Sequence, residues 1–398
     1  MKDITRAIHA RDVDPTELAQ LLQQRFQQAQ FTSEVQVDLP DAGSPVITLM
    51  YTRKGVLAQV LSSLDNEQID EIVLEVESKL LATTRPLPSR RVLFANTPVK
   101  GQWKSGLFTL AEAPSNAPRP PYLLGDHPLI MALEFDAIDD SFFNIQRADR
   151  LHHEYSLLLS VFVPGIRPMT NVTRSHWGIS TASNPPGEPI LSSWFQEFYD
   201  IPGFDRFGDP GDPEVLIELV EDATYYAQLG IMVGESLKLP SSLTRWVDGY
   251  AFLPAPAKRR FLRAAYWLRH SQQMFTTSQS ASLIASVQTV ESLLRPDQGI
   301  RCPTCGLMQG AGPTALFERF LDKHVGATGS PARKQLYKQR SQLAHGHELL
   351  TADEEIVFGW QSPRSPHEDG VVRDANRLAR AATISWLEEQ LTSPTHPR

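Results

Sequence analysis

One short stretch near the C-terminal end, residues 340–348 with the sequence RSQLAHGHE, combines an arginine with two histidines. Arg340 is followed five residues later by His345, and His347 comes after one intervening glycine. Histidine titrates near neutral pH, whereas arginine keeps its charge and presents a planar fork of donors that fits a phosphate. Such a pair suits metal-free cleavage of RNA, which requires proton transfer at two sugar oxygens and a fixed cation near the phosphate.

The spacing of this pair does not by itself select a site, because the sequence repeats it. Arg147 precedes His152 and Arg319 precedes His324 at the same distance. Only the pair at Arg340 follows a helical hairpin ending in VQTVESLL and a basic helix, and precedes a glycine and one long closing helix. The context therefore favours this pair over the other two.

Helix geometry leaves open which histidine works with Arg340. On a regular helix, positions five apart point about 140° away from each other, whereas positions seven apart nearly coincide. Either His345 lies where the helix begins or is distorted, or His347 is the functional partner. Both histidines remain candidates.

The segments VESLL (residues 290–294) and RSQLAHG (residues 340–346) resemble the two motifs of the HEPN superfamily, in its Apea-like branch. The resemblance covers residues 258–391 and none of the N-terminal region. It implies an all-α helical bundle that acts as a dimer, with Arg340 and His345 as the active-site pair and Glu291 in a supporting place. It also implies a metal-independent endoribonuclease, in phage defence or as a toxin. The alternative is a non-catalytic binding or adaptor module for nucleic acid or protein.

The only two cysteines, Cys302 and Cys305, stand in the sequence RCPTCGL. This spacing is typical of a tight turn in which two thiolates bind zinc, and tetrahedral zinc requires two more ligands. His324 is one candidate, and the same cysteines of a second chain are another. Two free thiols are the alternative to a structural zinc site.

The charge of the chain is unevenly distributed, with a formal net charge of −8 over 398 residues. Residues 258–340 hold thirteen Lys and Arg against four acids, a net charge of +9, so the rest of the chain carries −17. A basic region favours a polyanionic partner such as RNA, although charged helix faces often serve only solvation.

The elements around these residues indicate an α+β protein. Residues 14–30 predict a helix with Asp14 as its N-cap and Pro15 as its first residue. Residues 46–51, 90–96, 105–113 and 129–138 predict strands, and residues 154–165 fit either a helix or a strand. From residue 258 the pattern is helical. We therefore expect a β-rich mixed region over residues 1–245, acting as a sensor or regulator of unknown trigger, and a helical HEPN-like domain over residues 246–398.

No run approaches the about 20 apolar residues that span a bilayer, and the first residues lack the apolar core of a signal peptide. We expect a cytoplasmic protein without a membrane partner.

Overall fold

A computed structural model describes most of the chain. The described residues are 1–10, 12–26, 29–41, 44–53, 55–81, 83–113, 127–167, 177–180, 191–194, 215–227, 235–294, 300–301, 308–309, 312–326, 330–354 and 364–392. The chain forms two compact units, one of Met1–Ser89 with Glu134–Leu151, the other of Arg90–Leu133 with His152–Arg398.

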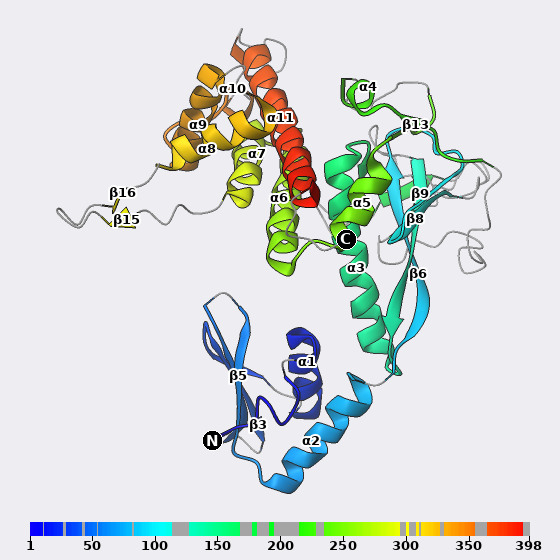
Figure 1. The fold of residues 1–398 in the computed structure, drawn as a ribbon, viewed down its shortest axis with the longest axis vertical. Coiled ribbons are helices and arrows are strands. Elements are labelled where there is room, and N and C mark those ends of the chain that lie inside the picture. Colours follow the sequence, from blue (N-terminus) through cyan, green and yellow to red (C-terminus); the bar gives the residue numbers. More distant parts are fainter. Residues whose placement is uncertain are drawn as a thin grey trace. The chain divides into compact units, whose positions relative to one another are not determined.

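The first unit contains a five-stranded antiparallel sheet in the order β1-β5-β4-β3-β2. Its strands are β1 (Lys2–Asp3), β2 (Gln30–Ser33), β3 (Gln36–Asp41), β4 (Ser44–Tyr51) and β5 (Leu57–Ser62). Two helices, α1 (Pro15–Phe26) and α2 (Asn66–Lys79), complete its core (Figure 1). The buried apolar side chains of this core include Leu18, Leu22, Leu49, Val60, Ile72 and Val76.

The predicted start of α1 is confirmed. The Asp14 carboxylate accepts hydrogen bonds from the backbone N–H groups of Thr16 at 2.9 Å and Glu17 at 3.2 Å, and Pro15 is the first helical residue. Asp14 thereby satisfies two N–H groups that have no partner within the helix.

A second five-stranded sheet has the order β10-β6-β9-β8-β7. Its strands are β6 (Arg85–Ala95), β7 (Gln102–Lys104), β8 (Phe108–Glu112), β9 (His127–Ala137) and β10 (Ile166–Arg167). Three short pairs also form: β11 (Trp177–Ser180) with β12 (Leu191–Trp194), β13 (Leu219–Val220) with β14 (Leu239–Pro240), and β15 (Ile300–Arg301) with β16 (Met308–Gln309). The strands predicted at residues 46–51, 90–96, 105–113 and 129–138 correspond to β4, β6, β8 and β9.

The segment that fits either a helix or a strand belongs to α3 (Ser141–Phe162). Its last turns are buried on every side, with Leu157, Leu158, Leu159, Val161 and Phe162 all in the core. A helix that is apolar all round loses the periodicity by which an amphipathic helix is recognised.

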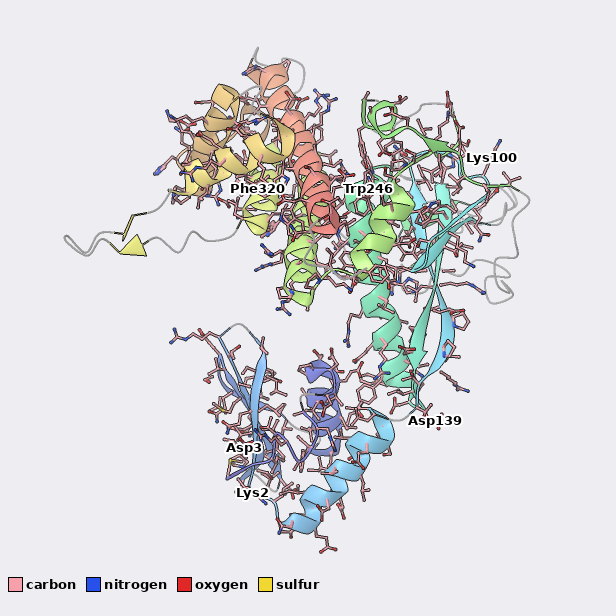
Figure 2. The ribbon with its side chains drawn as sticks, in the orientation of Figure 1. Lys2, Asp3, Lys100, Asp139, Trp246 and Phe320 are labelled. Atoms are coloured by element: carbon pink, nitrogen blue, oxygen red, sulfur yellow. The ribbon has the colours of Figure 1, made fainter. Side chains whose placement is uncertain are left out.

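The rest of the chain is mainly helical. The helices are α4 (Asp222–Ala227), α5 (Leu243–Ala251), α6 (Ala255–Met274), α7 (Gln279–Leu293), α8 (Pro313–Val325), α9 (Ser330–Ala344), α10 (Thr351–Glu354) and α11 (Arg364–Thr392). Helix α7 packs against α6, α9 and α11, and α11 also contacts α6 and α8 (Figure 1). The ring of Trp246 in α5, a residue labelled in Figure 2, stacks on Phe162 with 5.2 Å between centroids. The expected boundary at residue 245 falls within α5.

Small polar residues fix α7 against its neighbours. The Ser271 hydroxyl of α6 lies 2.6 Å from the Ser286 hydroxyl of α7, and the Asn376 amide of α11 donates to Ser271 at 2.7 Å. Hydroxyls of this size let helix backbones approach closely, and their mutual hydrogen bonds offset the cost of burying them. This network positions α7.

The structure thus has the expected α+β character, with a β-rich N-terminal region and a helical C-terminal part. None of the helices in the described part of the chain is long and apolar enough to cross a membrane.

Candidate functional site

Helices α7 and α9 bring Glu291 and Arg340 together. The Arg340 Nη2 donates to Glu291 Oε2 at 2.8 Å, and the hydroxyl of Tyr337 donates to Glu291 Oε1 at 3.0 Å. The Arg340 guanidinium also lies over the Tyr337 ring, 5.8 Å from its centroid. One carboxylate therefore holds both a cation and a phenol in place.

This cluster is partly open to water, since the Arg340 and Glu291 side chains are 21% and 26% exposed. The Nε of Arg340 is buried and has no hydrogen-bond partner among the described residues. An unsatisfied buried donor costs roughly 1–3 kcal/mol, so the cluster is not optimised for stability alone.

Tyr337 is the member of this cluster that the sequence did not reveal. It precedes Arg340 by three residues, a spacing that places two side chains on the same face of a helix. Burial and the hydrogen bond to Glu291 raise the pKa of the Tyr337 hydroxyl, so it stays protonated and can donate to the carboxylate. The three-residue spacing between Tyr337 and Arg340 was the sequence signal that could have predicted this contact.

The glycine of the RSQLAHG segment ends α9. The N–H of His347 donates to the carbonyl of Gln342 at 3.0 Å, and the N–H of Gly346 donates to that of Leu343 at 3.0 Å. These two bonds form a Schellman motif, whose key residue adopts a left-handed conformation, and Gly346 has φ of 70°. The helical path therefore ends at His345, and His347 lies beyond the turn.

His345 and His347 are both exposed at this helix end, with ring centroids 6.0 Å apart. The N–H of His345 still bonds to the carbonyl of Ser341 at 3.1 Å, so His345 continues the helical path. It lies about 140° around the axis from Arg340. The argument for His347 required a helix running through residue 347, and α9 ends at Ala344.

The other two Arg and His pairs have different surroundings. Arg147 is held by Glu17 through two hydrogen bonds of 2.9 and 2.7 Å, and His152 is buried. Burial lowers the pKa of His152 from 6.5 to about 3, with a smaller effect of Arg91. Only the pair at Arg340 combines an anchored guanidinium with an exposed imidazole.

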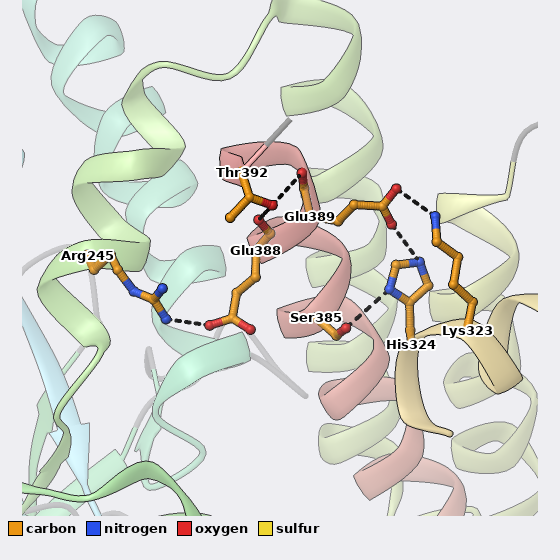
Figure 3. A pocket seen from close by; sticks show the side chains of 7 residues that line it. All are labelled: Arg245, Lys323, His324, Ser385, Glu388, Glu389 and Thr392. Carbon is orange, nitrogen blue, oxygen red and sulfur yellow. Dashed lines mark hydrogen bonds and ion pairs between the residues drawn. The ribbon is translucent and has the colours of Figure 1, made fainter. Parts of the chain in front are cut away.

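The third pair includes His324, the expected zinc ligand, which lies on α8 beside α11 (Figure 3). Its Nδ1 is 3.2 Å from the Ser385 hydroxyl and its Nε2 is 3.4 Å from Glu389 Oε2. Glu389 also binds Lys323 at 2.6 Å. Burial lowers the pKa of His324, with a smaller opposing effect of Glu389. Both ring nitrogens are engaged, so zinc would have to displace one of these contacts.

The expected ligands Cys302 and Cys305 lie outside the described residues. They fall in the connection between β15 and β16, which pair antiparallel. Within the described ranges, no three His, Cys, Asp or Glu side chains gather as a metal site would require. The zinc site therefore stays a prediction.

No protein-family model matches the chain, and no curated protein or solved structure matches it either.

Proposed function

We propose that this protein is a metal-independent endoribonuclease of HEPN type, acting as a dimer through Arg340 and His345. The observation that carries the proposal is the anchoring of Arg340 by Glu291 and Tyr337, close along the chain to two exposed imidazoles. The motifs that resemble the HEPN superfamily lie on α7 and α9, which pack together.

In the proposed reaction the 2′-oxygen of RNA attacks the adjacent phosphorus and the bond from phosphorus to the 5′-oxygen breaks. One imidazole takes the proton of the 2′-hydroxyl, and a second proton donor protonates the leaving 5′-oxygen. Arg340 stabilises the charge that develops on the phosphoryl oxygens. The products are a 2′,3′-cyclic phosphate and a 5′-hydroxyl.

The placement of Arg340 and His345 around α9 supports the proposal of a dimer. Because about 140° separates them on one helix, a single chain directs them to different faces. A twofold axis near the end of α9 would bring Arg340 of one chain to the His345 imidazole of the other, which gives two such sites in each dimer.

The test is cleavage of a single-stranded RNA by the purified protein in the presence of EDTA, with analysis of the product ends. Arg340→Ala and His345→Ala should each lower the rate by about 100-fold or more, because each removes a group that acts on the transition state. Arg319→Ala is the matched control, since it removes an exposed arginine with the same spacing to a histidine, and it should keep the wild-type rate.

His347→Ala decides between the two histidines and should also keep activity. Wild-type rates in both the Arg340→Ala and His345→Ala variants would overturn the proposal. Expression in a host gives a second readout, because a toxin or defence nuclease should arrest growth only when Arg340 and His345 are intact.

A second candidate is a non-catalytic binding or adaptor module, which is favoured by the ion pair itself. Glu291 neutralises Arg340, and a neutralised guanidinium attracts a phosphate less strongly. This function predicts nucleic-acid or protein binding without turnover, and equal behaviour of wild type and both variants in the cleavage assay.

We also propose that Cys302 and Cys305 bind a structural zinc ion, completed by His324 or by the cysteines of a second chain. Metal analysis of the purified protein should find zinc that Cys302→Ser removes. If His324→Ala leaves the zinc content unchanged while Cys302→Ser alters the oligomeric state, the second chain supplies the remaining ligands.

A further inference from the structure

Helix α6 presents two opposite faces. Its buried face includes Phe261, Ala264, Ala265 and Leu268. The residues Arg259, Arg263, Tyr266 and His270 follow one another at intervals of four, three and four, which keeps them on one face of a helix. At 100° per residue this second face lies opposite the buried one. We call these four residues the α6 stripe.

The charge of α6 has a single sign, because the helix contains five Lys and Arg and neither Asp nor Glu. Three of these cations have partners. Lys258 lies over the Tyr250 ring at 5.3 Å and Arg260 over the Trp386 ring at 5.4 Å, while Arg269 donates to the Ser156 hydroxyl at 3.4 Å.

The two arginines of the stripe differ from the other three cations. Arg259 and Arg263 are exposed. Neither takes part in an ion pair or hydrogen bond within the described part of the chain.

The acids on α7 and α11, two helices that pack against α6, are engaged elsewhere. On α7, Glu291 binds Arg340 and Tyr337. The five acids of α11 each have a partner. Glu368 accepts a hydrogen bond from the backbone of Thr351, and Asp369 contacts the side chains of Gln279 and Arg373. The other three form ion pairs: Asp374 with Arg377, Glu388 with Arg245, and Glu389 with Lys323. These acids therefore leave the stripe's positive charge uncompensated.

Aromatic rings follow the two arginines along the stripe. Tyr266 is 46% exposed, and its ring is parallel to that of His270, with 4° between the planes and 6.2 Å between centroids. Trp267 packs edge-on against Tyr266 at 5.4 Å and supports it from the side. A flat group stacked on Tyr266 would therefore lie parallel to the imidazole as well.

We propose that the α6 stripe binds single-stranded nucleic acid. Arginines track the phosphates of such a strand, and exposed aromatic rings stack on its unpaired bases, which a duplex does not offer. From Arg259 to His270 the helix rises about 17 Å, which is long enough to contact more than one phosphate of an extended strand. The inference deepens the proposed function by naming the surface that would hold a single-stranded substrate, and its link to cleavage rests on that function.

The test uses the full chain and a fluorescent 2′-O-methyl oligonucleotide, which lacks the attacking hydroxyl and so cannot be cleaved by the proposed reaction. Binding is measured by anisotropy at several salt concentrations. The double variant Arg259→Gln and Arg263→Gln should weaken binding by about tenfold at 0.15 M salt and reduce the slope of log K against log salt by about 1.4. Tyr266→Ala should weaken binding by about 5- to 100-fold, and Tyr266→Phe should not.

Two control variants match these changes outside the stripe. Arg53→Gln removes an exposed arginine of the first unit, and Phe31→Ala removes a more exposed aromatic ring on β2. Both should bind like wild type, and circular dichroism should show that every variant is folded.

Three outcomes would overturn the inference. They are wild-type affinity in the stripe variants, equal affinity for a duplex of the same sequence, and equal competition by poly-glutamate, which would assign the surface to an acidic protein. Because the probe resists cleavage, loss of binding and loss of catalysis are separate results. Intact binding in a protein without ribonuclease activity would leave this inference standing and contradict only the proposed function.

Discussion

Helices α3 and α9 each carry an arginine five residues before a histidine, and they place these residues in opposite environments. In α3, Arg147 donates to both carboxylate oxygens of Glu17, whose side chain is only 4% exposed, and to the carbonyl of Asp136 at 3.0 Å. In α9, Arg340 makes one hydrogen bond to Glu291 in a cluster that is partly open.

The histidines differ in the same direction. His152 is buried with a strongly lowered pKa, whereas His345 is exposed at a helix end. Identical spacing therefore buries the histidine in one helix and leaves it exposed to solvent at the end of the other. The distinction comes from burial and from the partner of the arginine, neither of which spacing encodes.

The largest expected effect is the loss of unfolding free energy when the arginine of each pair is removed. Arg147→Ala leaves the Glu17 carboxylate buried with only Arg150 near it at 3.3 Å, and should lower the free energy of unfolding by about 3 kcal/mol. Arg340→Ala should cost about 1 kcal/mol, because its partner is more exposed and keeps the hydrogen bond from Tyr337. Urea denaturation measures both, and equal losses would remove the distinction between the two pairs.

The next effect is the pH dependence of stability that His152 causes. His152 stays neutral in the folded chain, with a pKa of about 3, whereas in the unfolded chain it takes up a proton below about pH 6.5. Its contribution to stability is complete above pH 6.5 and is lost as the pH falls toward 3, by at most about 1.4 kcal/mol per pH unit. Urea denaturation between pH 7 and pH 4 should show a shallower slope for His152→Phe than for wild type. Parallel slopes would contradict the assignment.

The smallest effect tests the end of α9. Gly346→Ala places a Cβ on a left-handed backbone and should cost about 1–2 kcal/mol of unfolding free energy. Gly370→Ala is the matched control, because Gly370 lies in α11 with no atom within 4 Å of an added Cβ. It should stabilise the protein by about 0.5–1 kcal/mol. Changes of the same sign would contradict the Schellman motif at Gly346.

Several features followed directly from the sequence. Asp14 and Pro15 marked the start of α1, and short runs of β-branched and aromatic residues marked β4 and β9, because these signals act through the local backbone. The segment of α3 around Leu158 stayed ambiguous, since burial on all sides removes periodicity. On α7, Ser282 and Ser286 are buried against other helices. The sequence does not predict this, because polar residues of a helix are normally expected on its solvent-exposed face.

The candidate site was predictable only in part. Arg340 came from its spacing to a histidine and from its context, and Glu291 came from a resemblance. Their contact depends on how α7 and α9 pack, which no local signal specifies. Tyr337 was missed although it stands one turn before Arg340. Gly346 ends the helix through its left-handed conformation, and this removes the argument that placed His347 on the same helix face as Arg340.

The most direct test of the central claim is a subunit-mixing experiment with Arg340→Ala and His345→Ala. If each site combines Arg340 of one chain with His345 of the other, a mixed dimer retains one intact site although each variant alone is inactive. Random reassociation of equal amounts should restore RNA cleavage to about a quarter of the wild-type specific activity. A mixture that forms dimers and stays as inactive as its two components would contradict a site shared between chains.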